Sequence, residues 1–189
     1  MANNTVVVFS SDNGPWLSFK THGGSAGPLR AGKGTTFEGG QRVPTIFWGP
    51  GIVETGMVTE MGSTLDLMKT FAALAGVAPP ADRKMDSHDL SPVLKGEGDG
   101  PRDEFHYWTR AELHAIRSGK WKLHLKQREP VNYGKAIELA EPELYDLVAD
   151  ISEAHNVAAE HPEVVSELLK KVEEHLSLIH ISEPTRPRE

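Results

Sequence analysis

Cysteine is absent from the 189 residues, and long apolar runs are missing as well. Without thiols the chain can form no disulfide bond, no thiolate zinc site and no catalytic group that starts from a cysteine side chain. The longest apolar runs, 5–9 and 45–48, fall far short of the roughly 20 residues that a transmembrane helix needs. We therefore expect no membrane partner.

Basic residues are also too few for a nucleic-acid-binding protein. Lys and Arg number 20 against 27 Asp and Glu, the net charge is −7, and no Lys/Arg block occurs. A protein that binds nucleic acid would show a basic face. Hydrophobic residues make up 38% and charged residues 25%, which is typical of a globular protein. No export signal is visible at the N-terminus.

The first hundred residues show the pattern of an α/β protein. The continuous β-branched and aromatic run over 5–10 predicts a strand that is central in a parallel sheet and covered on both faces. A second strand is expected over 43–48, and a helix capped by Ser63 over 63–75. The glycine-rich segment 16–40 has no clear period, which predicts a long loop of the kind that is often functional.

The second half indicates a small α+β unit. A hairpin is expected around Ser118-Gly119, a further strand over 143–147, and an amphipathic helix over 162–176. On the second hairpin strand three apolar residues alternate with three polar ones, which predicts one buried and one solvent-exposed face. The apolar residues are Trp121, Leu123 and Leu125, and the polar ones are Lys122, His124 and Lys126. The pattern is typical of an antiparallel sheet with one packed helix.

Asp12 and Asn13 follow directly on the first predicted strand. They offer two hard oxygen donors at the end of a strand where α/β proteins bind ligands, and these donors suit Ca²⁺ or Mg²⁺. Two donors cannot complete a site of roughly six to eight oxygens, so ligands from elsewhere are required. The alternative is an ordinary turn, because Asp, Asn and Gly are common turn residues.

Lys33 lies between two glycines in the long loop. Its backbone can approach a ligand closely, and its ammonium suits a sulfate or phosphate oxygen or can protonate a leaving alkoxide. The alternative is a solvated lysine. The segment 27–33 matches the start of a phosphate-binding P-loop, but Gly34 stands where Ser or Thr is needed. His22 shares the loop and could touch a substrate, or could be an ordinary surface histidine.

Three segments taken together resemble the type I sulfatases, especially arylsulfatases. They are Phe9–Pro15, Pro28–Gly40 and Arg42–Pro44, and their order and spacing match as well as their residues. Further matching segments lie at 66–76, 89–96, 115–123 and 143–147. The resemblance covers about residues 4 to 176.

The resemblance implies hydrolysis of sulfate esters, on a sulfated small molecule or glycan, in an alkaline-phosphatase-like α/β fold with a small C-terminal α+β domain. Asp12 and Asn13 match two calcium ligands of the family. Lys33 matches a lysine that binds the sulfate and assists the leaving oxygen. Glu38 and the residues after it match supports of this loop. Family members are usually periplasmic, secreted or lysosomal, and the oligomeric state is left open.

The nucleophile of the family is not expected in this chain. It is a formylglycine made from a Cys/Ser-x-Pro-x-Arg motif upstream of the Asp-Asn pair, near two further aspartate ligands, and only eleven residues precede Asp12. We therefore expect a C-terminal fragment that is inactive alone. The string Ser182–Arg186 spells Ser-x-Pro-x-Arg, but it stands at the wrong end of the chain.

These inferences divide the chain into three parts. Residues 1–100 are expected to form the C-terminal portion of the catalytic domain, and 101–176 the α+β subdomain. Residues 177–189 are expected to be a disordered tail, because 177–187 resembles read-through of a sequencing adapter.

Two other functions stay open on the residues. One is a phosphate-ester hydrolase or phosphoryl transferase of the same superfold. Those relatives use two transition metals with an Asp-His pair, and Asn13 argues against them because an amide oxygen prefers a hard ion. The other is a non-catalytic binding module built from the C-terminal sheet and helix.

Overall fold

The computed structural model describes residues 2–129 and 134–182, which form two compact units. The first takes the described residues up to Ser11 together with Pro44–Asp103. The second takes Asp12–Val43 together with the described residues from Glu104 onward. The loop that carries Lys33 thus belongs to the same unit as the second half of the chain, whereas the sequence division at residue 100 separates them and stays a prediction.

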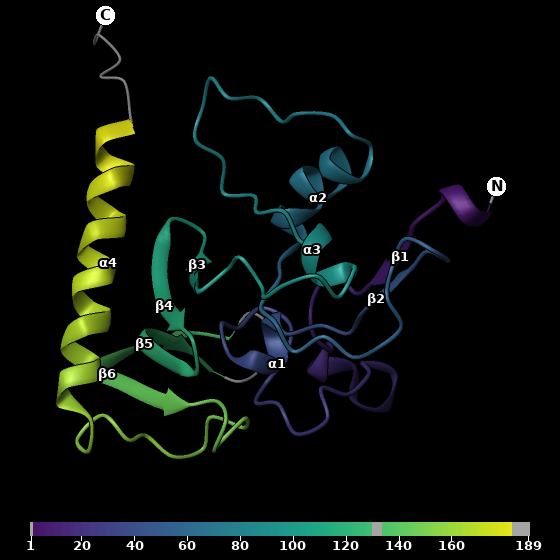
Figure 1. Cartoon of the computed structure of the whole chain (residues 1–189). Coiled ribbons are helices and arrows are strands. Elements are labelled where there is room, and N and C mark those ends of the chain that lie inside the picture. Colours follow the sequence, from purple (N-terminus) through teal and green to yellow (C-terminus); the bar gives the residue numbers. More distant parts are fainter. Residues whose placement is uncertain (1, 130–133, 183–189) are drawn as a thin grey trace, which may run out of the picture. The chain divides into compact units, whose positions relative to one another are not determined.

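The first unit combines a two-stranded sheet with short helices (Figure 1). Strand β1 (Val7–Ser10) pairs antiparallel with β2 (Thr45–Trp48). The helical elements are η1 (Ala2–Asn4), η3 (Thr64–Asp66), α2 (Leu67–Leu74) and α3 (Ser91–Leu94).

The prediction of a central, doubly covered parallel strand over 5–10 is wrong for this structure. Val7 stands opposite Trp48, and Phe9 stands opposite Ile46. All four side chains are exposed, Phe9 by 68%. A continuous apolar run predicts burial, but the burial has to come from neighbouring elements. Among the described residues β2 is the one strand that pairs with β1.

The predicted helix over 63–75 is confirmed as η3 followed by α2. Ser63 and Asp66 form a capping box, in which the Ser63 N–H donates to Asp66 Oδ2 at 2.8 Å. The helix ends before Gly76, whose φ of 68° is readily adopted by glycine. Asp66 also accepts hydrogen bonds from Arg102 Nε at 3.0 Å and from the His88 N–H at 2.8 Å. One buried carboxylate therefore joins three segments of this unit.

The second unit contains a four-stranded antiparallel sheet in the order β3-β4-β5-β6, with helix α4 alongside it (Figure 1). The strands are β3 (Glu104–Thr109), β4 (Glu112–Ser118), β5 (Trp121–Arg128) and β6 (Ala136–Asp146). Helix α4 spans Pro162–Ser182, while η2 (Leu17–His22) and α1 (Glu38–Gln41) lie in the long loop. The antiparallel sheet with one packed helix is confirmed.

Helix α4 covers one face of this sheet and closes its hydrophobic core. The core consists of apolar residues from β4, β5, β6 and α4, namely Leu113, Ile116, Leu123, Leu144, Leu168 and Val172. Trp121 and Leu125 pack against it, as the alternation on β5 predicts. The helix continues through residues 177–182, so this part of the predicted disordered tail is helical. Residues 183–189 lie outside the described residues, and no described helix is long and apolar enough to span a membrane.

Two stacked histidines lie between β3 and α4 and predict a pH-dependent stability. The rings of His106 and His175 are 3.6 Å apart and nearly parallel. Burial, followed by the charge of His175, lowers the pKa of His106 to about 4; Glu104 opposes this shift and Lys171 adds to it. A histidine in the unfolded chain titrates near 6.5, so the unfolded state takes up this proton first as the pH falls.

The free energy of unfolding should therefore fall as the pH drops from about 6.5 to about 4. His106→Gln should flatten this dependence, by less than the about 1.4 kcal/mol per pH unit that one proton contributes. Urea unfolding at several pH values between 7 and 4 measures the slope. His155→Gln, at a side chain that is 82% exposed, is the control and should leave the slope unchanged. Equal slopes for the His106 variant and the wild type would contradict the expectation.

Candidate active site

The loop after β1 brings the predicted metal ligands near the predicted sulfate-binding lysine. Asp12 is exposed and Asn13 is partly buried. Two residues after Asn13, the carbonyl of Pro15 accepts a hydrogen bond from the backbone N–H of Lys33 at 2.9 Å. Residues that lie about twenty positions apart in the sequence are thereby held on neighbouring backbone segments.

Glycines make this close approach of two backbones possible. The Gly14 N–H donates to the carbonyl of Gly40 at 3.0 Å. A Cβ atom on Gly14 would lie 1.7 Å from the carbonyl oxygen of Gly39, and one on Gly32 would lie 2.3 Å from that of Pro15. No side chain fits at these distances, so Gly14 and Gly32 are required by the contact itself.

The ammonium of Lys33 lies beside an aromatic ring. Its Nζ is 5.2 Å from the centre of the Trp16 ring, and the side chain is partly buried. The Trp16 N–H donates to the carbonyl of Gly23 at 2.9 Å, which closes the segment containing η2 into a small loop. His22, the last residue of η2, is exposed on this loop.

Asp12 and Asn13 suit a hard cation in the kind of donor they supply. A carboxylate and an amide oxygen are ligands that Ca²⁺ and Mg²⁺ accept. Within residues 2–129 and 134–182, no group of three or more His, Asp or Glu side chains is arranged to hold a metal ion. The pair thus fits part of a calcium site, and the remaining ligands have to come from other groups.

A buried charge network lies behind the lysine loop. Lys122 Nζ on β5 is 2.9 Å from Glu38 Oε1 and 3.0 Å from Glu153 Oε1. His124 Nε2, two residues further along β5, is 2.8 Å from the same oxygen of Glu153. All four side chains are buried. One ammonium is therefore shared by two carboxylates away from solvent.

The prediction that the polar face of β5 is exposed to solvent is therefore wrong at two of its three positions. Lys122 and His124 are 0% exposed, while Lys126 remains partly exposed. The alternation correctly placed these side chains opposite the helix-covered face. That second face is covered by Glu38 and Glu153, which come from distant parts of the chain and neutralise Lys122.

The network anchors the segment that carries Lys33 on both sides. Before Lys33, Arg30 Nη1 donates to the carbonyl of Glu153 at 2.6 Å, and its guanidinium lies 4.2 Å from the centre of the Phe37 ring. After Lys33, the Glu38 N–H donates to Glu153 Oε2 at 2.6 Å. Glu153 itself adopts a φ of 50°, which is uncommon for a non-glycine residue and indicates that its surroundings hold it there.

The pKa shift of Glu153 agrees with an ionised carboxylate in this network. Burial raises the pKa of Glu153, but the hydrogen bond from His124 and the charge of Lys122 outweigh it and lower the pKa below its ordinary value. Burial lowers the pKa of His124. Burial, followed by the charge of Glu38, raises the pKa of Tyr107 well above its ordinary value. Tyr107 therefore keeps its proton, and its O–H donates a hydrogen bond to Glu38 Oε1 at 3.2 Å.

Sequence reasoning missed most of this network. The family resemblance marked Glu38 as a support of the loop and included Arg30 in a matching segment, but Glu153 carried no signal of its own. Lys122 and His124 were visible as polar residues on one face of a strand. That pattern is equally compatible with a solvated face, so only the tertiary contacts identify them.

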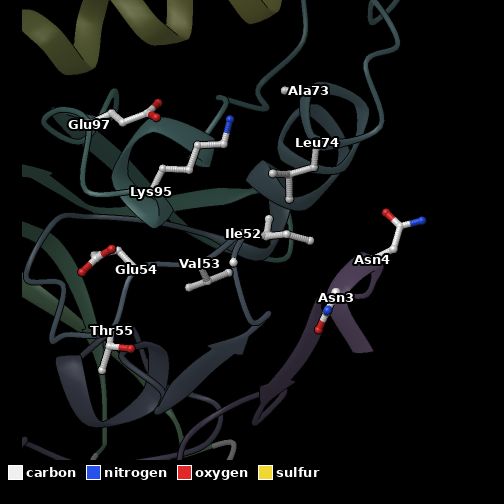
Figure 2. A pocket seen from close by; sticks show the side chains of 11 residues that line it. Asn3, Asn4, Ile52, Val53, Glu54, Thr55, Ala73, Leu74, Lys95 and Glu97 are labelled. Carbon is white, nitrogen blue, oxygen red and sulfur yellow. The ribbon is translucent and has the colours of Figure 1, made fainter. Parts of the chain in front are cut away.

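A separate open cavity of about 760 Å³ lies within the first unit (Figure 2). Figure 2 shows the charged side chains of Lys95, Glu54 and Glu97 around it, with Asn3 and Asn4 from η1. None of the site residues predicted from the sequence lines this cavity.

Two models of known families match the two halves of the chain. Residues 1–77 match the model of the family described as sulfatase. Residues 100–186 match the model described as the C-terminal region of aryl-sulfatase. The chain belongs to the sulfatase family and corresponds to the C-terminal portion of its type I, arylsulfatase-like members.

Individual relatives agree with this assignment. Arylsulfatase A of Bos taurus is 37% identical over 92% of this chain and 37% of its own length. N-acetylgalactosamine-6-sulfatase of Canis lupus familiaris is 46% identical over 66% of this chain and 24% of its own length. The chain thus spans little more than a third of the length of the first of these relatives, and its match covers about a quarter of the second.

Solved structures show the same fold. A sulfatase from Pseudoalteromonas sp., PsFucS1, superposes with a TM-score of 0.83 at 27% identity, over 93% of this chain and 37% of its own. BT4656, solved in complex with its substrate D-glucosamine-2-N,6-O-disulfate, superposes with a TM-score of 0.63 at 26% identity, over 98% of this chain and 37% of its own. The predicted fold class, the C-terminal part of a sulfatase α/β domain with a small α+β part, is confirmed.

Proposed function

We propose that this chain is the C-terminal portion of a calcium-dependent sulfatase that hydrolyses sulfate esters of a small molecule or glycan. The observation that carries the proposal is the hydrogen bond from the Lys33 N–H to Pro15, because it holds the lysine loop against the turn of Asp12 and Asn13. Membership in the sulfatase family and the sulfated substrate of BT4656 support the choice of a sulfate ester.

Lys33 carries the part of the reaction that these residues can perform. Its ammonium can bind an oxygen of the sulfate and donate a proton or a hydrogen bond to the oxygen that leaves. The positive charge is held in place before reaction, so it stabilises negative charge as the ester bond breaks. His22, exposed on the neighbouring loop, is proposed to contact the substrate.

Asp12 and Asn13 would hold part of the calcium site. A calcium ion there would screen the charge of the sulfate and orient it. No residue of the chain is assigned as the nucleophile, and the formylglycine of the family is proposed to lie outside these residues. We accordingly expect the chain by itself to hydrolyse no sulfate ester.

Removal of the lysine charge tests the proposal. In a sulfatase that joins this chain to a nucleophile-bearing portion, Lys33→Ala should lower kcat on an aryl sulfate by about 10²–10³-fold, the loss typical of one preorganised charge or donor. Lys84→Ala, at an exposed lysine outside this loop, is the control and should behave as the wild type. Unchanged kinetics in the Lys33 variant would remove this residue from the mechanism.

Calcium titration of the chain alone tests the proposed metal ligands. With Asp12 and Asn13 as the donors, calcium should bind weakly, with a dissociation constant of about 1 mM or higher, because most of the roughly six to eight ligands are missing. Isothermal titration calorimetry measures the constant, and Asp12→Asn should weaken it further. Micromolar affinity would show that the chain holds a complete site elsewhere.

A further inference from the structure

An exposed aromatic pair stands next to the proposed sulfate-binding lysine. The rings of Trp16 and Phe19 have centres 4.2 Å apart and are inclined by 42°. Trp16 is 40% exposed and Phe19 is 52% exposed. Leu17 between them is exposed as well. Contiguous exposed apolar side chains of this size are typical of a surface that binds something.

The loop that carries the pair is closed by its own backbone. The Trp16 N–H donates to Gly23, and the Phe19 N–H donates to the carbonyl of Trp16 at 2.9 Å. The Gly23 N–H donates back to the carbonyl of Lys20 at 3.1 Å, and Lys20 adopts a φ of 52°. A Cβ on Gly23 would lie 2.0 Å from the carbonyl oxygen of Trp16. The aromatic side chains are thus presented by a backbone that is held in one shape, as in binding loops on a rigid scaffold.

The lysine and the aromatic pair form one continuous surface. Lys33 Nζ lies 5.2 Å from the centre of the Trp16 ring, and the Lys33 N–H donates a hydrogen bond to the carbonyl of Pro15, the residue before Trp16. A positive charge therefore adjoins an apolar ring surface. A sulfate ester has the complementary construction, an anionic group attached to a ring with apolar faces.

We propose that Trp16 and Phe19 form a stacking platform for the ring, sugar or aryl, that bears the sulfate bound by Lys33. Ligand sites commonly combine aromatic walls with a few placed polar groups, and the aromatic contact provides the affinity for the ring. This inference rests on the function proposed for Lys33 and adds to it the residues that select the ring. It assigns no step of bond cleavage to the two aromatic residues.

The experiment measures binding to the 189-residue chain by ligand-observed NMR titration. Two ring probes are used, 4-nitrophenyl sulfate for an aryl ring and N-acetylglucosamine 6-sulfate for a sugar, with inorganic sulfate as the ring-free probe. Trp16→Ala and Phe19→Ala should each weaken at least one ring probe by about tenfold and leave the affinity for inorganic sulfate unchanged. Trp16→Phe should keep most of the affinity, which guards against a loss caused by misfolding.

Trp48→Ala is the matched control, because Trp48 on β2 is 49% exposed and lies outside the loop. It should change neither kind of binding. The platform is overturned if neither ring probe binds the wild type, or if Trp16→Ala and Phe19→Ala leave the affinities for both ring probes unchanged. It is also overturned if these variants weaken the binding of inorganic sulfate as much as the binding of the ring probes. If Lys33→Ala leaves inorganic sulfate unaffected while Trp16→Ala still weakens a ring probe, the function proposed for Lys33 fails and the platform stands.

Discussion

Replacing Lys122 by methionine is expected to destabilise the second unit by about 3–5 kcal/mol, because it removes the ammonium between two buried carboxylates. Lys122 Nζ lies 2.9 Å from Glu38 and 3.0 Å from Glu153, and all three side chains are almost fully buried. Methionine fills a similar volume, so the loss reports the uncompensated charge more than a cavity. Urea unfolding followed by circular dichroism measures it.

Lys126→Met is the matched control on the same strand. Lys126 is partly exposed, and its distances to Glu112 and Glu138 are 3.4 and 3.7 Å, with both carboxylates exposed. Solvent screens such pairs, so the unfolding midpoint should hardly move. Similar shifts for Lys122→Met and Lys126→Met would show that the buried network contributes little to stability.

The Lys122→Met variant also tests how the buried network supports the candidate active site. Glu38 and Arg30 hold the loop on either side of Lys33, and both reach Glu153. Once Lys122 is gone, the two glutamates repel each other and this anchoring weakens. The Lys33 N–H donates a hydrogen bond to the carbonyl of Pro15. Its amide hydrogen exchange should therefore become faster in Lys122→Met and stay unchanged in Lys126→Met.

Asp66→Asn is expected to lower the free energy of unfolding of the first unit by about 3–5 kcal/mol, because it too removes one charge of a buried ion pair. The Asp66 carboxylate is 0% exposed and faces Arg102, whose Nε and Nη2 lie 3.0 and 2.5 Å away. It also accepts the N–H groups of Ser63 and His88. Asparagine keeps the shape but removes the negative charge that faces the buried guanidinium.

Asp82→Asn provides the comparison, since Asp82 forms a bidentate pair with Arg83 in which both side chains are exposed. Its unfolding midpoint should match that of the wild type. Urea unfolding monitored by amide exchange on α2 separates the first unit from the second. A wild-type midpoint for Asp66→Asn would mean that the capping box and the ion pair contribute little.

Local patterns predicted the elements of the second half well. The hairpin around Gly119, the strand that became part of β6 and helix α4 all follow from apolar periodicity and turn residues. These signals act over a few residues, so they are present in the sequence itself. The capping box of Ser63 and Asp66 is local in the same way.

Patterns that depend on distant partners were less informative. The run over 5–10 indicated a buried strand, yet Phe9 is exposed, because covering elements are not encoded in the strand. The alternation on β5 placed Lys122 and His124 on one face but could not tell that this face is buried. The Asp12, Asn13 and Lys33 roles came from family resemblance and stay proposals.

The sequence by itself indicated the helix after Ser63, helix α4, the hairpin of β4 and β5, the family and the candidate site residues, since these depend on short segments and their order. Only the tertiary structure decided that Lys33 lies against the loop of Asp12 and Asn13, and that Glu38, Lys122 and Glu153 share one buried network. The reason is that a charge is buried only where an opposite charge meets it, and the ammonium of Lys122 meets carboxylates from distant parts of the chain, with Glu38 lying 84 positions before it.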